Sequence, residues 1–154
     1  MNIYCEWHKV IYLNDGSKEN LIFNIDETLL PDESGCYVFF NEYGEKRRII
    51  YIGRANNLRQ RIKEQLNNVR LMNGIKNFGK GYKAFIYCTI KPKRGQNLKK
   101  ILEILERNLI KYAFTEGHEL VNIQGAKIHF HEISFHGNRA SESLFSRKIL
   151  SPTK

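Results

Sequence analysis

The stretch GCYVFFNEYGEKRRIIYIG, residues 35–53, decides the fold of this 154-residue chain. Within it, Cys36–Asn41 and Arg48–Gly53 are rich in aromatic and β-branched residues and predict two strands. The polar, glycine-containing segment between them predicts a hairpin turn, which makes the strands antiparallel neighbours. This pairing brings Tyr37 and Tyr51 into the same part of the sheet.

The segments that follow predict one more strand and two helices. Residues 83–91 supply the strand. A helix capped by Asn56 or Asn57 runs to about residue 67, and residues 97–114 form a second one, because apolar side chains recur in both at helical spacing. We therefore expect an α+β fold, with a small central antiparallel sheet of about three strands flanked by helices.

Weaker patterns occur towards both ends. Leu21–Ile25 and residues 127–135 each predict a strand, and residues 141–150 predict a short terminal helix. Residues 68–82 are expected to form a basic, glycine-bearing loop, which is either an ordinary surface connection or a contact to the backbone of a nucleic acid.

Length and composition indicate one soluble domain, residues 1–154. The chain contains no apolar run near the ~18 residues of a membrane span and no signal-peptide pattern, so we expect a cytoplasmic protein without membrane contact. The three cysteines form no Cys-x-x-Cys pair and are expected to be reduced, structural thiols.

The net charge of +9 is unevenly distributed. Residues 1–45 hold 2 basic and 9 acidic side chains, a charge of −7; residues 46–100 hold 16 and 1, a charge of +15; residues 101–154 hold 7 and 6, a charge of +1. The middle segment predicts a strongly positive face and a polyanionic partner. Alternatively, the basic residues scatter over several faces, or the acidic first segment lies against them.

Two charged residues lie beside or within apolar helical stripes. Arg61 lies at the edge of the stripe of the first helix, which suits a held, functional arginine as well as a solvated one. Glu106 falls inside the stripe of the second helix, where a carboxylate requires a cation or a hydrogen-bond donor. It is either half of a structural ion pair or a functional group, and Glu103 takes its place if the helix phase is shifted.

Two other patterns imitate ligand sites. Residues 74–80 match the spacing of a phosphate-binding loop, but Gly81 replaces the magnesium-binding hydroxyl and a strand follows, so we reject a nucleotide site. His129, His131 and His136 are compatible with a metal, but a packed face is the commoner cause of such a group.

Taken in order, these features resemble the GIY-YIG nuclease family, over residues 34–124. The two name-giving motifs read Gly35-Cys36-Tyr37 and Tyr51-Ile52-Gly53. The family's arginine, ten residues after the second tyrosine, falls on Arg61, its glutamate on Glu106, and its later asparagine on Asn122. Residues 1–33 and 125–154 are then an acidic N-terminal extension and a C-terminal extension.

The resemblance implies that Tyr37, Tyr51, Arg61 and Glu106 are catalytic. Glu106 would bind a single divalent metal, Mg²⁺ or Mn²⁺, and Arg61 would stabilise charge on the scissile phosphate. Tyr37 would orient the attacking water or accept its proton, and Tyr51 would shape the same pocket. A phenol with its ordinary pKa of about 10 is a poor base, so neighbouring Arg54, Arg61 and the metal are expected to favour the phenolate.

Arg54, Arg59, Gln65 and Asn122 are the expected substrate contacts. Many family members have histidine where this chain has Gln65, and isoleucine where it has Cys36. Glutamine can hydrogen-bond but cannot exchange a proton near neutral pH, so the chemistry at this position is expected to differ.

The expected function is a divalent-metal-dependent DNA endonuclease, with RNA left open as a substrate. One rival is a catalytically inactive nucleic-acid-binding module of the same fold. Another is a protein-interaction domain that self-associates through its acidic first 45 residues and its basic middle. Symmetric cutting of both strands would require a homodimer, and the sequence leaves the oligomeric state open.

Overall fold

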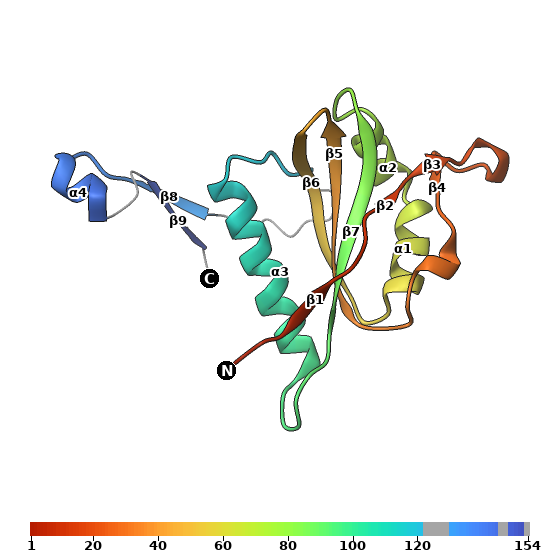
Figure 1. Ribbon diagram of the computed structural model, residues 1–154, viewed down its shortest axis with the longest axis horizontal. Coiled ribbons are helices and arrows are strands. Elements are labelled where there is room, and N and C mark those ends of the chain that lie inside the picture. Colours follow the sequence, from red (N-terminus) through yellow and green to blue (C-terminus); the bar gives the residue numbers. More distant parts are fainter. Residues whose placement is uncertain (122–129, 145–147, 153–154) are drawn as a thin grey trace.

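A five-stranded antiparallel sheet forms the centre of the computed structural model, which describes residues 1–121, 130–144 and 148–152 (Figure 1). The path order is β1-β7-β5-β6, and β2 also pairs with β7. The strands are β1 (Cys5–Trp7), β2 (Ile11–Tyr12), β5 (Gly35–Tyr43), β6 (Lys46–Ala55) and β7 (Tyr82–Ile90). The hairpin that carries the two motifs thus supplies β5, an inner strand of the sheet, and β6, the strand at one edge.

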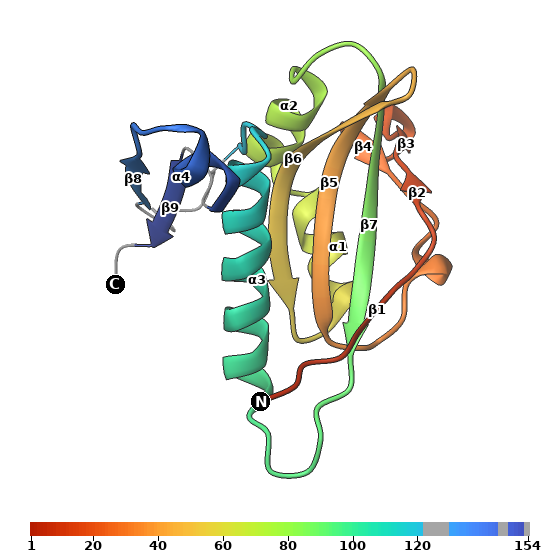
Figure 2. The same cartoon turned by 60° about the vertical axis from the view of Figure 1, so that its left-hand side comes forward.

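Helices cover both faces of this sheet. They are α1 (Leu58–Leu66), α2 (Val69–Lys76) and α3 (Leu98–Thr115). Asn57, Asn68 and Asn97 cap them, each accepting a hydrogen bond from the backbone N–H three residues later. α1 and α2 lie on one face and α3 lies on the other, along β6 (Figure 2).

The alternation of β5 divides the core in two. Tyr37 and Phe39 point towards α1 and α2, whereas Cys36 and Val38 point towards α3. A bulge between Phe39 and Phe40, opposite β6, interrupts the regular register. The two motif tyrosines therefore belong to the face that α1 covers.

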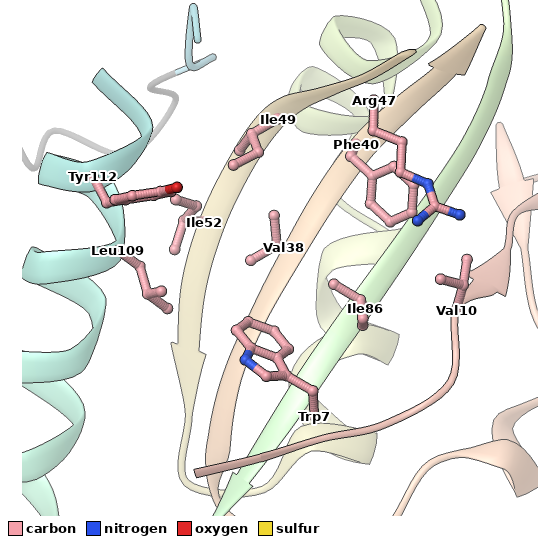
Figure 3. Close-up of a pocket in the computed structure, with 10 residues that line it drawn as sticks. All are labelled: Trp7, Val10, Val38, Phe40, Arg47, Ile49, Ile52, Ile86, Leu109 and Tyr112. Atoms are coloured by element: carbon pink, nitrogen blue, oxygen red, sulfur yellow. The ribbon is translucent and has the colours of Figure 1, made fainter. Parts of the chain in front are cut away.

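α3 leaves part of its own face of the sheet open. An apolar groove of about 410 Å³ lies there, between Tyr112 of α3 and Trp7 of the N-terminal segment (Figure 3). Val38, Ile52 and Ile86 are among the side chains that line it.

Shorter elements flank the sheet. Near the N-terminus these are β3 (Asn14–Asp15), β4 (Phe23–Asn24) and the 3₁₀ turns η1 (Ser17–Glu19) and η2 (Glu27–Leu29). The C-terminal part contains the paired strands β8 (Phe130–Ser134) and β9 (Lys148–Pro152) and the helix α4 (Arg139–Leu144), which lie beyond α3.

The expected α+β class and helix-flanked antiparallel sheet are confirmed, but the sheet has five strands and not about three. β1 and β2 were missed because both are short and are held by pairing with the distant β7. The expected loop 68–82 contains α2, whose buried Leu71, Met72 and Ile75 supply a short apolar face. The expected helix 141–150 is met only over residues 141–144, which belong to α4, whereas residues 148–150 pair with β8 as part of β9.

Two further findings concern the cysteines and the lengths of the helices. Cys5, Cys36 and Cys88 are free thiols, and the last two are fully buried. Within the described ranges, no helix has the length and apolar character needed to cross a bilayer.

Candidate active site

The two motif tyrosines lie together on the α1 face of the sheet. Their ring centroids are 6.1 Å apart, as the expected hairpin pairing requires. Gly53 is directly opposite Tyr37 in the register, and a Cβ atom at Gly53 would lie 2.4 Å from both Cζ and Oη of Tyr37. The second motif therefore needs glycine because the Tyr37 ring occupies the space of a side chain.

The glycine of the first motif has a similar explanation on the neighbouring strand. Gly35 approaches β7 so closely that an added Cβ would lie 1.8 Å from the carbonyl oxygen of Cys88. Any side chain there would force β5 and β7 apart, and so would move the strand that carries Tyr37.

Gln65 holds the hydroxyl of Tyr37. Its Nε2 donates to Tyr37 Oη over 2.7 Å, and both side chains are buried, with exposed fractions of 2% and 0%. Its Oε1 accepts from Asn68 Nδ2 at 3.4 Å, which fixes the orientation of the amide. Gln65 is expected to touch substrate; in this structure its side chain is buried and its amide contacts Tyr37.

The surroundings of Tyr37 disfavour the phenolate. Burial, and then the neighbouring Tyr51, raise the pKa of Tyr37 well above its ordinary value, while Gln65 and Arg61 lower it only in part. The expectation that neighbouring charges stabilise a phenolate is therefore not met by the residues of the protein. Tyr37 is a neutral phenol here, suited to orienting a water or a phosphate oxygen.

Arg61 connects the tyrosines with the acidic side of the site. Its guanidinium is close enough to lower the pKa of Tyr37, and its Nη1 lies 3.1 Å from Oε2 of Glu64. It is also close enough to lower the pKa of Glu106. Arg61 lies at the edge of the buried stripe of α1, and this position brings its side chain close to both Tyr37 and Glu106.

Glu106 lies on α3 beside Arg54 of β6. Arg54 Nη1 is 3.5 Å from Glu106 Oε2, and Arg54 Nη2 is 3.7 Å from Glu103 Oε1. The Glu106 side chain is only 25% exposed, and burial raises its pKa even though Arg54 and Arg61 act in the opposite direction. Both candidate carboxylates thus meet at one arginine, with Glu106 the more buried of the two.

A polar cavity of about 280 Å³ opens beside these groups, where β6 passes into α1. Arg54 and Arg61 line it together with Asn56, Asn57 and Gln60. Two guanidiniums and the start of a helix make this a suitable place for an anionic oxygen.

Of the remaining predicted site residues, Arg59 makes its contacts elsewhere. Arg59 donates through Nε and Nη2 to the carbonyl of Leu30 and through Nη1 to Asp32, so the structure gives it the role of holding residues 30–32 on α1. Asn122 and His129 lie outside the described residues. Among those described, no group of three or more metal-ligating side chains is present.

The suggestion that acidic residues 1–45 cover basic residues is met in part. The ion pairs between these segments are Glu27–Lys63, Asp32–Arg59 and Glu42–Arg47. Most cations of residues 46–100 make no such pair in the described ranges.

Sequence reasoning missed the segment that follows α3. Nδ1 of His118 accepts a hydrogen bond from the backbone N–H of Ile49, and the N–H of Val121 donates to the carbonyl of Ile50. This segment is thereby held against β6, next to Tyr51. No periodicity signals such a connection, because two isolated backbone contacts carry it.

Residues 33–113 match the model of the GIY-YIG catalytic domain, a range that includes both motif tyrosines, Arg61 and Glu106. The chain belongs to the GIY-YIG family. It therefore carries a nuclease-type catalytic domain, although the match ends before Asn122.

Two relatives of this GIY-YIG chain are UvrABC system protein C from different bacteria. The protein of Mycoplasma mycoides subsp. mycoides is 34% identical over 100 residues, which cover 61% of this chain and 14% of the relative. That of Symbiobacterium thermophilum is 45% identical over 42 residues, 27% of this chain and 6% of the relative. The chain thus corresponds to a small part of each relative. No solved structure gives a significant match.

Proposed function

We propose that this protein is a divalent-metal-dependent endonuclease that hydrolyses phosphodiester bonds of DNA. The observation that carries the proposal is the position of Arg61, which is close enough to lower the pKa of Tyr37 on one side and of Glu106 on the other. Arg61 of α1 thus lies near a tyrosine of β5 and a carboxylate of α3, and it also lines the polar cavity.

The two arginines are the groups that would bind the scissile phosphate. Arg54 and Arg61 line the cavity, and an always-charged guanidinium suits phosphate oxygens that gain negative charge in the transition state. Arg54 must then exchange its contacts with Glu103 and Glu106 for contacts with the phosphate.

Tyr37 would act as a hydrogen-bond donor. Its oxygen accepts from Gln65 Nε2, and the amide oxygen of Gln65 is turned to Asn68, so Gln65 does not take the phenolic proton. The phenolic proton is therefore directed to the attacking water or to a phosphate oxygen, once substrate has shifted the side chains that cover Tyr37. Tyr51 would bound the same space from β6.

Glu106 fits a metal that retains much of its water shell. Mg²⁺ is commonly held by one or two carboxylates, with waters and substrate phosphate oxygens completing its ligands. Glu106, with Glu103 one turn away on α3, can supply those carboxylates. When bound, such a metal polarises the phosphate and lowers the pKa of a coordinated water.

The test is cleavage of supercoiled plasmid by the wild-type protein and by Glu106→Ala, with Mg²⁺ or Mn²⁺ and with a chelator control. We expect nicked or linear DNA that requires metal and is lost in the variant. Equal cutting by Glu106→Ala, or cutting in the chelator, would contradict the proposal. Salt-sensitive DNA binding without cutting, on plasmid and on branched substrates, would instead favour the binding-only module.

A further inference from the structure

A second polar cavity lies at the opposite end of the sheet from the candidate active site. It measures about 590 Å³, within the roughly 300–1,000 Å³ typical of ligand pockets. The β5–β6 hairpin and the loop before β7 form it, at the upper end of the sheet in Figure 1. Lys46, Arg47, Arg48 and Lys80 line it, and no acidic side chain does.

Three of these cations are available to a ligand. Arg47 is held by Glu42 at 2.7 Å and lies over the Phe40 ring. Lys46, Arg48 and Lys80 are exposed, and none of them forms an ion pair within residues 1–121, 130–144 and 148–152.

The floor of the cavity is built and not merely a gap between loops. Asn41 is buried, donates through Nδ2 to the carbonyl of Lys80 over 2.8 Å, and accepts from Lys83 Nζ, which also donates to the carbonyl of Gly79. Gly81 has a φ of +132°, and a Cβ there would lie 2.4 Å from the carbonyl oxygen of Glu42. The loop is thus fixed onto β5 by side-chain hydrogen bonds and by a backbone shape that favours glycine.

Lys83 adds a buried positive charge beneath this floor. Lys83 is only 7% exposed, and its Nζ donates hydrogen bonds to neutral oxygens of Asn41 and Gly79. No carboxylate forms an ion pair with it in the described part of the chain. An anion in the cavity would therefore be attracted by a positive charge that no carboxylate of the described residues neutralises.

The cavity lies on the same face of the sheet as the motif tyrosines. Asn41 and Tyr43 follow Tyr37 and Phe39 at alternate positions of β5, and Arg48 is the register partner of Asn41. Asn41 and Tyr43 lie four and six residues from Tyr37, or about 13–20 Å at ~3.4 Å per residue. One strand of a duplex advances ~3.4 Å per nucleotide along the axis, so this separation corresponds to about four to six nucleotides.

We propose that this hairpin cavity binds a backbone phosphate of the substrate DNA, about four to six nucleotides from the scissile bond. The assignment rests on the proposed nuclease function and adds a contact that fixes the register of the duplex without reading its sequence. Lys46 and Arg48 lie on β6, the strand that also carries Tyr51 and Arg54, so one strand of the protein connects the two sites. Tyr43, 63% exposed at the rim, can pack against the neighbouring sugar or base.

The test compares two triple variants of equal charge. Lys46→Gln/Arg48→Gln/Lys80→Gln empties the cavity of its available cations. Its matched control, Lys9→Gln/Lys18→Gln/Lys91→Gln, removes three exposed lysines elsewhere. DNA binding is measured by fluorescence anisotropy without divalent metal, over a range of salt concentrations and with duplexes of graded length.

We expect the cavity variant to lower the slope of log affinity against log salt by about one for each phosphate that the protein no longer neutralises. It should also reach its plateau affinity on duplexes about four to six base pairs shorter than the wild type needs. The control should change neither quantity, and Lys46→Arg/Arg48→Lys/Lys80→Arg should keep both. Circular dichroism checks that each variant is folded.

The outcomes separate the cavity from the function on which it rests. Equal reductions of affinity in the two triple variants, or an unchanged length dependence in the cavity variant, would overturn the cavity and leave the nuclease intact. No DNA binding by the wild-type protein would overturn the DNA-directed function and the assigned ligand together.

Discussion

Replacing Gln65 with leucine removes the buried donor that holds the Tyr37 hydroxyl while nearly keeping the side-chain volume. The hydrogen bond is 2.7 Å long and both partners are buried, so water cannot replace it. Losing one partner of such a bond costs about 1–3 kcal/mol. For a chain of this length each kcal/mol lowers Tm by roughly 2–4 °C, so we expect a fall of about 2–12 °C.

The assay is a double-mutant cycle with Tyr37→Phe, measured by urea unfolding. Each single variant leaves the other partner of the bond unsatisfied, whereas the double variant removes both. The double variant should therefore be more stable than the sum of the single effects predicts, by about 0.5–1.5 kcal/mol. Gln60→Leu, an exposed substitution on the same helix, should change stability by no more than about 0.5 kcal/mol.

Activity distinguishes a positioning role from a purely structural one. If Gln65 orients Tyr37 for the reaction, Gln65→Leu should lower kcat much more than it changes KM, at a temperature where the variant is fully folded. Gln65→His, which keeps a ring N–H donor, should retain more activity than the leucine variant. Additive effects in the cycle within about 0.3–0.5 kcal/mol, together with an unchanged kcat, would refute the reasoning.

Three further predictions concern the same region. Gly53→Ala should displace Tyr37, lower the free energy of unfolding by about 1–3 kcal/mol through overpacking, and abolish cleavage. Urea unfolding measures the first effect and the plasmid assay the second. A fully active variant would contradict the steric argument. Arg54→Gln should raise the pKa of Glu106 further, because a neighbouring cation is removed. The acid limb of a pH–activity profile at saturating metal should therefore move to higher pH. An unmoved limb would show that Glu106 is not the group that titrates there. Asn57→Ala removes the cap of α1 and should cost about 1 kcal/mol in urea unfolding, whereas unchanged stability would show that the cap is dispensable.

Local patterns predicted the central elements well. The hairpin follows from two short strand-forming runs around a polar turn, and α1 and α3 follow from apolar spacing and asparagine caps that the structure confirms. These features depend on neighbours in sequence, so a single sequence contains enough information to place them.

The sequence supplied the residues of the candidate site as a prediction, but it did not supply their contacts. The order of the motifs placed Tyr37, Tyr51, Arg61 and Glu106 in one family pattern, and the family match includes them all. The partner of Gln65 and the sharing of Arg54 between Glu103 and Glu106 required coordinates, because β5 is distant in sequence from α1, and β6 from α3.

The sequence by itself therefore determined the α+β class, the motif hairpin, the two long helices and the family, since each rests on short-range spacing. The tertiary structure alone decided that Tyr37 is buried and neutral, that Gln65 serves it, and that β1 and β2 extend the sheet. The physical reason is that burial, protonation and strand pairing are set by atoms that meet only when distant segments pack.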